Sequence, residues 1–134
     1  MTDQVAAASG VVVKTSPLPV PDAVARLSQL IAEKGMKLFA LIDHSGAAAE
    51  NGIELRDTKV VIFGSPVGGT PVMDAAPLVA LDLPLKVLIY DDSGSTKIAY
   101  SPPAELARRY GLSDDLAARF AGINALTDAL SNAD

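Results

Sequence analysis

The side chain best suited to acid–base chemistry is His44, which follows the apolar run 37–42 directly after Asp43. Histidine changes charge near neutral pH, so His44 is a candidate general acid or base and a candidate ligand-binding group. Asp43 is not expected to orient the imidazole, because neighbouring side chains on a strand point to opposite faces. A structural alternative stays open, in which a ring nitrogen of His44 caps a turn or a helix start.

A second candidate site is the glycine-rich segment 64–71. Its G-x-x-x-x-G-T spacing is similar to a phosphate-binding loop, but no lysine follows Gly69, so a nucleotide triphosphatase is excluded. Backbone N–H groups near Gly64, Ser65 and Thr70 could still hold a small anion, although two prolines in the segment each remove a donor. The alternative is a tight turn that needs the conformational freedom of glycine.

Asp82 precedes Leu83-Pro84 and an apolar run. Its default role is to accept hydrogen bonds from a nearby turn, and proximity to His44 would make it functional instead. The candidate ligand-binding residues are therefore His44, Gly64, Ser65, Gly69, Thr70 and Asp82. No metal ligand set is expected and no cofactor is identified. The acidic turn at 91–94 lacks the ligand ladder and closing glutamate of a calcium loop.

Composition limits the chemistry further. The chain has 134 residues, no cysteine, one histidine and a formal net charge of -5. Thiolate nucleophiles, thiolate metal sites and disulfides are excluded, and nucleic acid is an unfavourable partner for a chain with no basic run. No apolar stretch approaches the ~18 residues of a membrane span, and the start lacks a secretory pattern. We therefore expect a cytoplasmic protein without a membrane partner.

The elements that would position these residues are short. Residues typical of strands occupy five segments, 11–15, 37–42, 59–63, 85–90 and 96–100. An apolar stripe at helical spacing predicts a helix that starts near Pro21 and ends at Gly35. Further helices are expected over 46–51, over 72–81 with a break near Pro77, from Pro103 to Tyr110, and from Ser113 to Leu130. The segment 64–71 is expected to be a loop, and 91–95 a hairpin turn.

One domain, 1–134, accounts for the length, with residues 1–9 expected to be flexible. The order of elements and the hairpin predict an α+β fold. We expect a two-layer sandwich with about five strands in a mixed or antiparallel sheet and helices packed on one face.

Several motifs together resemble the DUF302 family, which has the TT1751-like fold. They are Phe63-Gly64-Ser65-Pro66 followed by Gly-Thr and Met73, the Asp82-Leu83-Pro84 element, Ile42-Asp43-His44, and the Asp-x-Gly hairpin that ends near Tyr100. The resemblance runs from about Val11 to Leu130. It departs from the family at Ser65, where asparagine is common. It implies an α+β fold and often a homodimer, and it implies no reaction.

Three functions follow as alternatives. The first is a domain that binds a small ligand or anion in a pocket near His44 and the Gly64–Thr70 segment, because both follow strand ends. The second is an enzyme that uses His44 as general acid or base with Asp43 or Asp82 assisting, although no nucleophile–base–orienter set is visible. The third is a dimeric structural or interaction module without a ligand.

Overall fold

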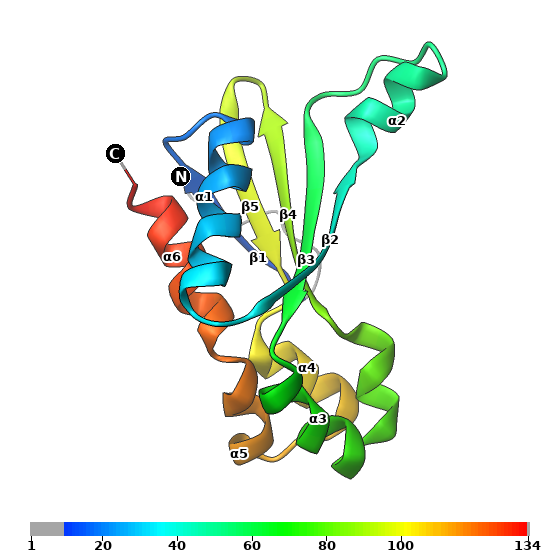
Figure 1. Cartoon of the computed structure of the whole chain (residues 1–134), viewed down its shortest axis with the longest axis vertical. Coiled ribbons are helices and arrows are strands. Elements are labelled where there is room, and N and C mark those ends of the chain that lie inside the picture. Colours follow the sequence, from blue (N-terminus) through cyan, green and yellow to red (C-terminus); the bar gives the residue numbers. More distant parts are fainter. Residues whose placement is uncertain (1–9, 134) are drawn as a thin grey trace.

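The computed structural model describes residues 10–133 as a five-stranded antiparallel sheet with helices on one face and at one end (Figure 1). Across the sheet the strands are ordered β1-β5-β4-β3-β2, and every neighbouring pair is antiparallel. The strands are β1 (Val12–Ser16), β2 (Lys37–Asp43), β3 (Thr58–Gly64), β4 (Leu85–Asp92) and β5 (Ser95–Tyr100). The expected α+β fold is confirmed, with an antiparallel sheet. The expected flexibility of residues 1–9 concerns residues outside those described.

Two helices, α1 (Val20–Glu33) and α6 (Gly122–Ser131), cover one face of the sheet (Figure 1). The remaining helical segments lie beyond the ends of the strands. They are α2 (His44–Glu50), α3 (Pro66–Ala75), the 3₁₀ segment η1 (Pro77–Asp82), α4 (Pro103–Tyr110), α5 (Asp114–Ala117) and the 3₁₀ segment η2 (Ala118–Phe120). In Figure 1, α2 stands at one end of the sheet, and α3, α4 and α5 gather at the other.

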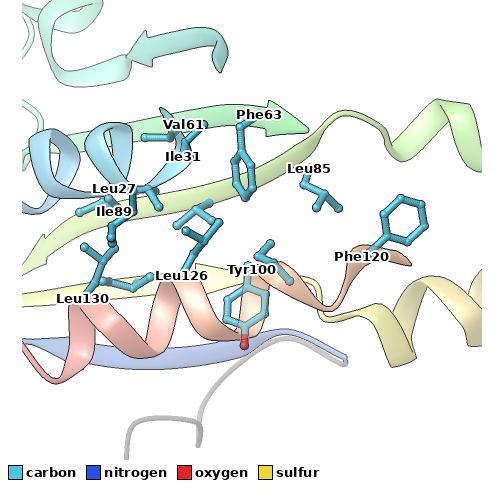
Figure 2. Close-up of a cluster of buried hydrophobic side chains, with 14 of the residues drawn as sticks. Leu27, Ile31, Val61, Phe63, Leu85, Ile89, Tyr100, Phe120, Leu126 and Leu130 are labelled. Carbon is cyan, nitrogen blue, oxygen red and sulfur yellow. The ribbon is translucent and has the colours of Figure 1, made fainter. Parts of the chain in front are cut away.

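The core lies between the sheet and the α1/α6 layer. The predicted stripe of α1 is buried, with Leu27 fully enclosed and Ile31 1% exposed. Figure 2 shows these two side chains meeting strand residues such as Ile89, with Leu126 and Leu130 of α6 closing the cluster. Burial at this periodicity is what fixes a short amphipathic helix against a sheet.

The predicted hairpin between β4 and β5 is confirmed. Ser93 and Gly94 have φ values of 53° and 94°. A left-handed conformation at both central residues is typical of the tight turns whose twist matches the flanking strands. The N–H of Gly94 also donates to the Asp91 carboxylate at 3.1 Å, which closes the turn.

The prediction of a loop over 64–71 is wrong. α3 begins at Pro66, six residues before the expected helix start at Val72. Ser65 is the N-cap, and its hydroxyl accepts the N–H of Gly68 at 3.1 Å. Pro66 occupies the first turn, where its fixed φ suits a helix and its missing N–H costs nothing. Cap and proline therefore outweigh the low helix propensity of the two glycines. The break expected near Pro77 is present, since α3 ends at Ala75.

A single C-terminal helix from Ser113 to Leu130 was also expected, and the structure divides it into α5, η2 and α6. At the break, the N–H of Ala121 bonds to the carbonyl of Ala118 at 3.1 Å. This i→i+3 bond tightens the turn and redirects the chain. Apolar residues of the predicted helix are buried on both sides of the break, and Phe120 is 5% exposed.

The strand β2 forms one edge of the sheet and sets the positions of both predicted motifs. It pairs with β3 so that Lys37 lies opposite Gly64 and Asp43 lies opposite Lys59, with a bulge between Leu38 and Ala40. β2, β3 and α2 form an arm that extends away from the α1/α6 layer (Figure 1). α2 itself contains no buried residue.

Candidate functional site

A cavity of about 450 Å³ opens at the end of the sheet where β3 passes into α3. Its walls come from parts of the chain that are distant in sequence. Most of the lining is apolar, including Met36, Phe39, Met73, Leu83, Phe120 and Ile123. Figure 2 shows Phe120 and Leu85 at one end of the buried cluster, so this cavity continues from the core.

Four polar side chains contribute to the same cavity. Lys34, the C-cap residue of α1, and Arg119 of η2 bring two positive charges. Ser65 and Thr70 bring hydroxyl groups from the start of α3. Lys34, Arg119 and Thr70 are exposed, so they form the rim of the cavity rather than its floor.

Glycines keep part of the cavity open. A Cβ added at Gly64 would lie 3.6 Å from Cβ of Pro84 and 3.8 Å from Cε2 of Phe39. A Cβ added at Gly69 would lie 3.9 Å from Cε of Met73. These are ordinary contact distances, so larger side chains at either position would take up space that is now free.

The expectation that backbone amides of this segment hold an anion is only weakly supported by its geometry. Pro66 has no N–H, the N–H of Gly68 donates to the Ser65 hydroxyl, and the N–H of Gly69 donates to the Ser65 carbonyl at 2.7 Å. These amides serve the helix start itself. An anion in the cavity would therefore be met by the side chains of Lys34 and Arg119.

His44 lies at the opposite end of the sheet. It is the first residue of α2, after the end of β2 that is paired with Lys59, whereas Gly64 is paired with Lys37. Six residues of strand, at about 3.4 Å each, separate the two ends by about 20 Å. The structure therefore does not bring His44 and the Gly64–Thr70 segment together within one chain.

The structure also answers the capping alternative for His44. Asp43 is the cap of α2, and its carboxylate accepts the N–H of Gly46 at 2.8 Å. That hydrogen bond lowers the pKa of the Asp43 carboxyl, and further hydrogen bonds from Ser45 and Lys59 act in the same direction. His44 is exposed, and its side chain makes no hydrogen bond with any residue in the range 10–133.

Asp82 lies at the cavity end of the sheet but outside the cavity lining. Its carboxylate accepts a 2.6 Å hydrogen bond from the hydroxyl of Tyr110 and pairs with Arg109. The hydrogen bond from Tyr110 is the main cause of a lowered Asp82 pKa. Asp82 therefore connects the end of η1 to α4, far from His44.

Sequence reasoning identified Gly64, Ser65, Gly69 and Thr70 and missed the rest of the cavity. No pattern in the chain linked Lys34 with Arg119, which are far apart in sequence and line one cavity only because of the tertiary fold. Residues 10–133 contain no cluster of three metal-ligating side chains. Over the same range, the structure has no helix with both the length and the apolar character required to cross a membrane.

Comparison with known proteins places the chain in a family. A solved structure of an uncharacterised conserved DUF302 protein from Bacillus stearothermophilus superposes with a TM-score of 0.77, at 20% identity, over 92% of this chain and 97% of that one. This likeness concerns the fold.

Two curated relatives are similar over part of their length. Proteins named fluoride-specific ion channel FluC 1, from Brucella suis biovar 1 and Brucella abortus biovar 1, are each 37% identical over 112 residues, or 81% of this chain. The match covers 44% and 42% of those proteins, so the chain spans less than half of their length. The profile of the family described as domain of unknown function DUF302 matches residues 12–132, and the chain therefore belongs to the DUF302 family.

Proposed function

We propose that this protein binds a small molecule with an apolar body and an anionic group in the cavity between β3, α3 and η2. The observation that carries the proposal is the pair of cations, Lys34 and Arg119, on the rim of a largely apolar cavity. Its volume of about 450 Å³ is typical of small-molecule sites.

The two parts of such a ligand would use different forces. An apolar body would displace water from Met36, Phe39 and Phe120, at roughly 25 cal/mol per Å² of apolar surface removed from water. A carboxylate or phosphate would stay near the solvent, where a charge-assisted hydrogen bond to Arg119 avoids the cost of burying a charge. The hydroxyl of Thr70, exposed at the same rim, offers a further donor.

Calorimetric titration with decanoate and with decanol tests this proposal. These ligands share an apolar chain and differ in charge. We expect saturable binding of decanoate by the wild type, weakened about tenfold in Arg119→Gln because one charge-assisted hydrogen bond contributes roughly 1.5 kcal/mol. Decanol binding should change little. Arg26→Gln is the matched control, since Arg26 lies on α1 outside the cavity and contacts Gln29. Absence of saturable binding for carboxylates and phosphates of several chain lengths would overturn the proposal.

A second candidate function follows from the curated relatives, which are named fluoride-specific ion channels. Because the matching 112 residues cover 44% of the Brucella suis protein, a membrane-spanning part would have to come from its remaining length. We infer that this domain acts beside such a channel and senses fluoride at Arg119 and Lys34.

A ¹⁹F NMR titration with sodium fluoride tests this inference. The ¹⁹F chemical shift should change saturably with the wild type, and Arg119→Gln should remove that change. Unchanged ¹⁹F spectra beside clear decanoate binding would exclude fluoride and retain the first proposal.

Three further expectations stay predictions: acid–base catalysis by His44, a homodimer, and a cytoplasmic location. Catalysis in the cavity requires His44 to reach it, and within one chain it lies about 20 Å away along the strand. The exposed apolar edge of β2 supports the homodimer, because large exposed apolar surfaces mark interaction sites.

A further inference from the structure

We infer that two copies of this chain associate through the outer edge of β2, and that the partner's His44 completes the cavity of each copy. The dimer is argued from the exposed surface and stands independently of the ligand. The role of His44 rests on the function proposed above, because it adds a side chain to that cavity.

The edge strand β2 is unusually apolar for a strand with no neighbour on one side. Leu38, Phe39, Leu41 and Ile42 are 42%, 44%, 49% and 39% exposed. Solvent-exposed edge strands normally carry charged residues or proline that prevent pairing. Here four of the seven residues of the strand are large and apolar. Such an edge favours a partner that removes it from water.

The other exposed apolar residues extend the same surface. Within residues 10–133, every large hydrophobic side chain that is exposed lies on β2, on the segment between α2 and β3, or on α3 and η1. Those beyond β2 are Ile53, Leu55, Val67, Leu78 and Leu81. In the view of Figure 1, α2 and the segment after α3 project on the same side of the molecule, at opposite ends of β2.

A second copy fits this distribution. Two identical edge strands related by a two-fold axis pair antiparallel, so each contributes the same patch. An axis near Ala40 or Leu41 would carry Ile53 and Leu55 of one copy towards α3 and η1 of the other. All three apolar segments would then be covered at once. Within one chain these segments lie at opposite ends of β2 and stay exposed.

The charges at the ends of β2 agree with this arrangement. Lys37 begins the strand and Asp43 ends it. Antiparallel association places each Lys37 near the partner's Asp43, whereas parallel association would bring like charges together. Within the described chain, the ammonium group of Lys37 lies 4.8 Å from the centre of the Phe39 ring and joins no ion pair. It therefore remains available to a carboxylate of a second copy.

The same symmetry changes the position of His44. With the axis at Ala40, the partner's His44 lies opposite Met36, and with the axis at Leu41 it lies opposite Leu38. Both registers are compatible with antiparallel pairing, because the axis can pass through a hydrogen-bonded or a non-hydrogen-bonded pair. In both, the histidine, which directly follows β2, arrives at the cavity end of the partner's β2, near Met36 and Phe39 of the lining. The partner's His44 would add an imidazole to the rim that Lys34 and Arg119 form.

The dimer is tested by cross-linking, since the chain contains no cysteine. Ala40→Cys and Leu41→Cys place one thiol at or beside the axis, where opposite Cα atoms about 4.5–5.5 Å apart suit a disulfide. Under mild oxidation we expect one variant to form covalent dimers in good yield. Ala32→Cys, exposed on α1, is the control and should stay monomeric.

Light scattering of the wild-type protein should give twice the mass of one chain. A wild type that is monomeric at every concentration, or equal cross-linking of all three variants, would overturn the inference.

The shared site is tested by complementation with decanoate as the probe. His44→Ala and Arg119→Gln should each weaken decanoate binding, the first by about fivefold, the scale of one hydrogen bond. When differently tagged copies are refolded together and the mixed dimer is isolated, one of its two cavities carries neither change. We therefore expect half of the sites to bind with wild-type affinity. A site built within one chain would leave no intact site in the mixed dimer.

The results separate the two proposals. If the wild type dimerises through β2 but binds no decanoate, the proposed function fails and the interface stands. If the wild type binds decanoate and His44→Ala binds equally well, the proposed function stands and the shared site is overturned. If His44→Ala is weakened without rescue in the mixed dimer, the arrangement across two chains is wrong.

Discussion

The hydroxyl of Tyr110 donates a 2.6 Å hydrogen bond to Oδ2 of Asp82, which joins the end of η1 to the last turn of α4. The bond lowers the pKa of Asp82 and raises the pKa of the Tyr110 phenol, as expected when it favours the ionised carboxylate. Arg109 connects the same carboxylate to Glu105 through a 3.0 Å hydrogen bond. The segment that carries Leu83 and Pro84 into the cavity wall is thereby fixed to α4.

Asp82→Ala should lower the free energy of unfolding by about 1–3 kcal/mol, because Tyr110 and Arg109 lose a charged acceptor. Decanoate binding should persist, since Asp82 lies outside the cavity lining. Chemical denaturation of Asp82→Ala, Tyr110→Phe and the double variant measures the coupling between the two residues. Loss of binding with unchanged stability would assign Asp82 to the site instead.

Acid should weaken the structure through Glu105. Hydrogen bonds from Arg108, with a smaller contribution from Arg109, lower the pKa of the Glu105 carboxyl from 4.5 to about 2. A carboxyl whose pKa is lower in the folded state stabilises the protein above its unfolded pKa. We therefore expect this stabilisation to be complete above about pH 4.5 and to be lost as the pH falls towards 2.

Denaturation midpoints between pH 2 and 6 check the Glu105 prediction. In Glu105→Gln, the part of the pH dependence that comes from this carboxyl should disappear, and stability at neutral pH should be lower than in the wild type. An identical pH profile in both proteins would show that Glu105 is not protonated preferentially in the unfolded chain.

Two neighbouring glycines of α3 provide a matched pair. Gly68→Ala and Gly69→Ala each replace a helical glycine with the best helix former, so each should raise stability by up to about 1 kcal/mol. A Cβ at Gly68 would lie 3.5 Å from the Ser65 hydroxyl, which is ordinary contact. Only Gly69 lines the cavity, so only Gly69→Ala should weaken decanoate binding. Equal effects of both variants on calorimetric affinity would contradict the assigned position of the cavity.

Gly10 is the position where glycine is required most strongly. Its φ of 80° lies in the left-handed region, and an added Cβ would lie 2.3 Å from Cδ of Glu105. Because Arg108 and Arg109 hold that carboxylate, it has little freedom to move aside. Gly10→Ala should lower the free energy of unfolding by about 1–2 kcal/mol. Gly35→Ala is the control, since Gly35 has a φ of 72° and no neighbouring atom within 4 Å, so it reports the backbone strain alone.

Local features of the sequence determined most of the elements. The β-branched runs, the stripe of α1 and the Ser93-Gly94 turn each depend on interactions between near neighbours, so the strands, the first helix and the hairpin could be predicted. The start of α3 carried a signal as well, since Ser65-Pro66 is a cap followed by a first-turn proline. The density of glycine in the same segment obscured that signal.

Which of the candidate residues share one site, and which further residues join them, was decided by tertiary structure. His44 directly follows the C-terminal end of β2 and Gly64 is the last residue of β3, a pattern that would bring them together if the two strands were parallel. The two strands are antiparallel, so hydrogen-bond register sends their C-terminal ends to opposite ends of the sheet. The converse holds for Lys34 and Arg119: no local pattern relates them, and the tertiary fold brings both to the lining of one cavity.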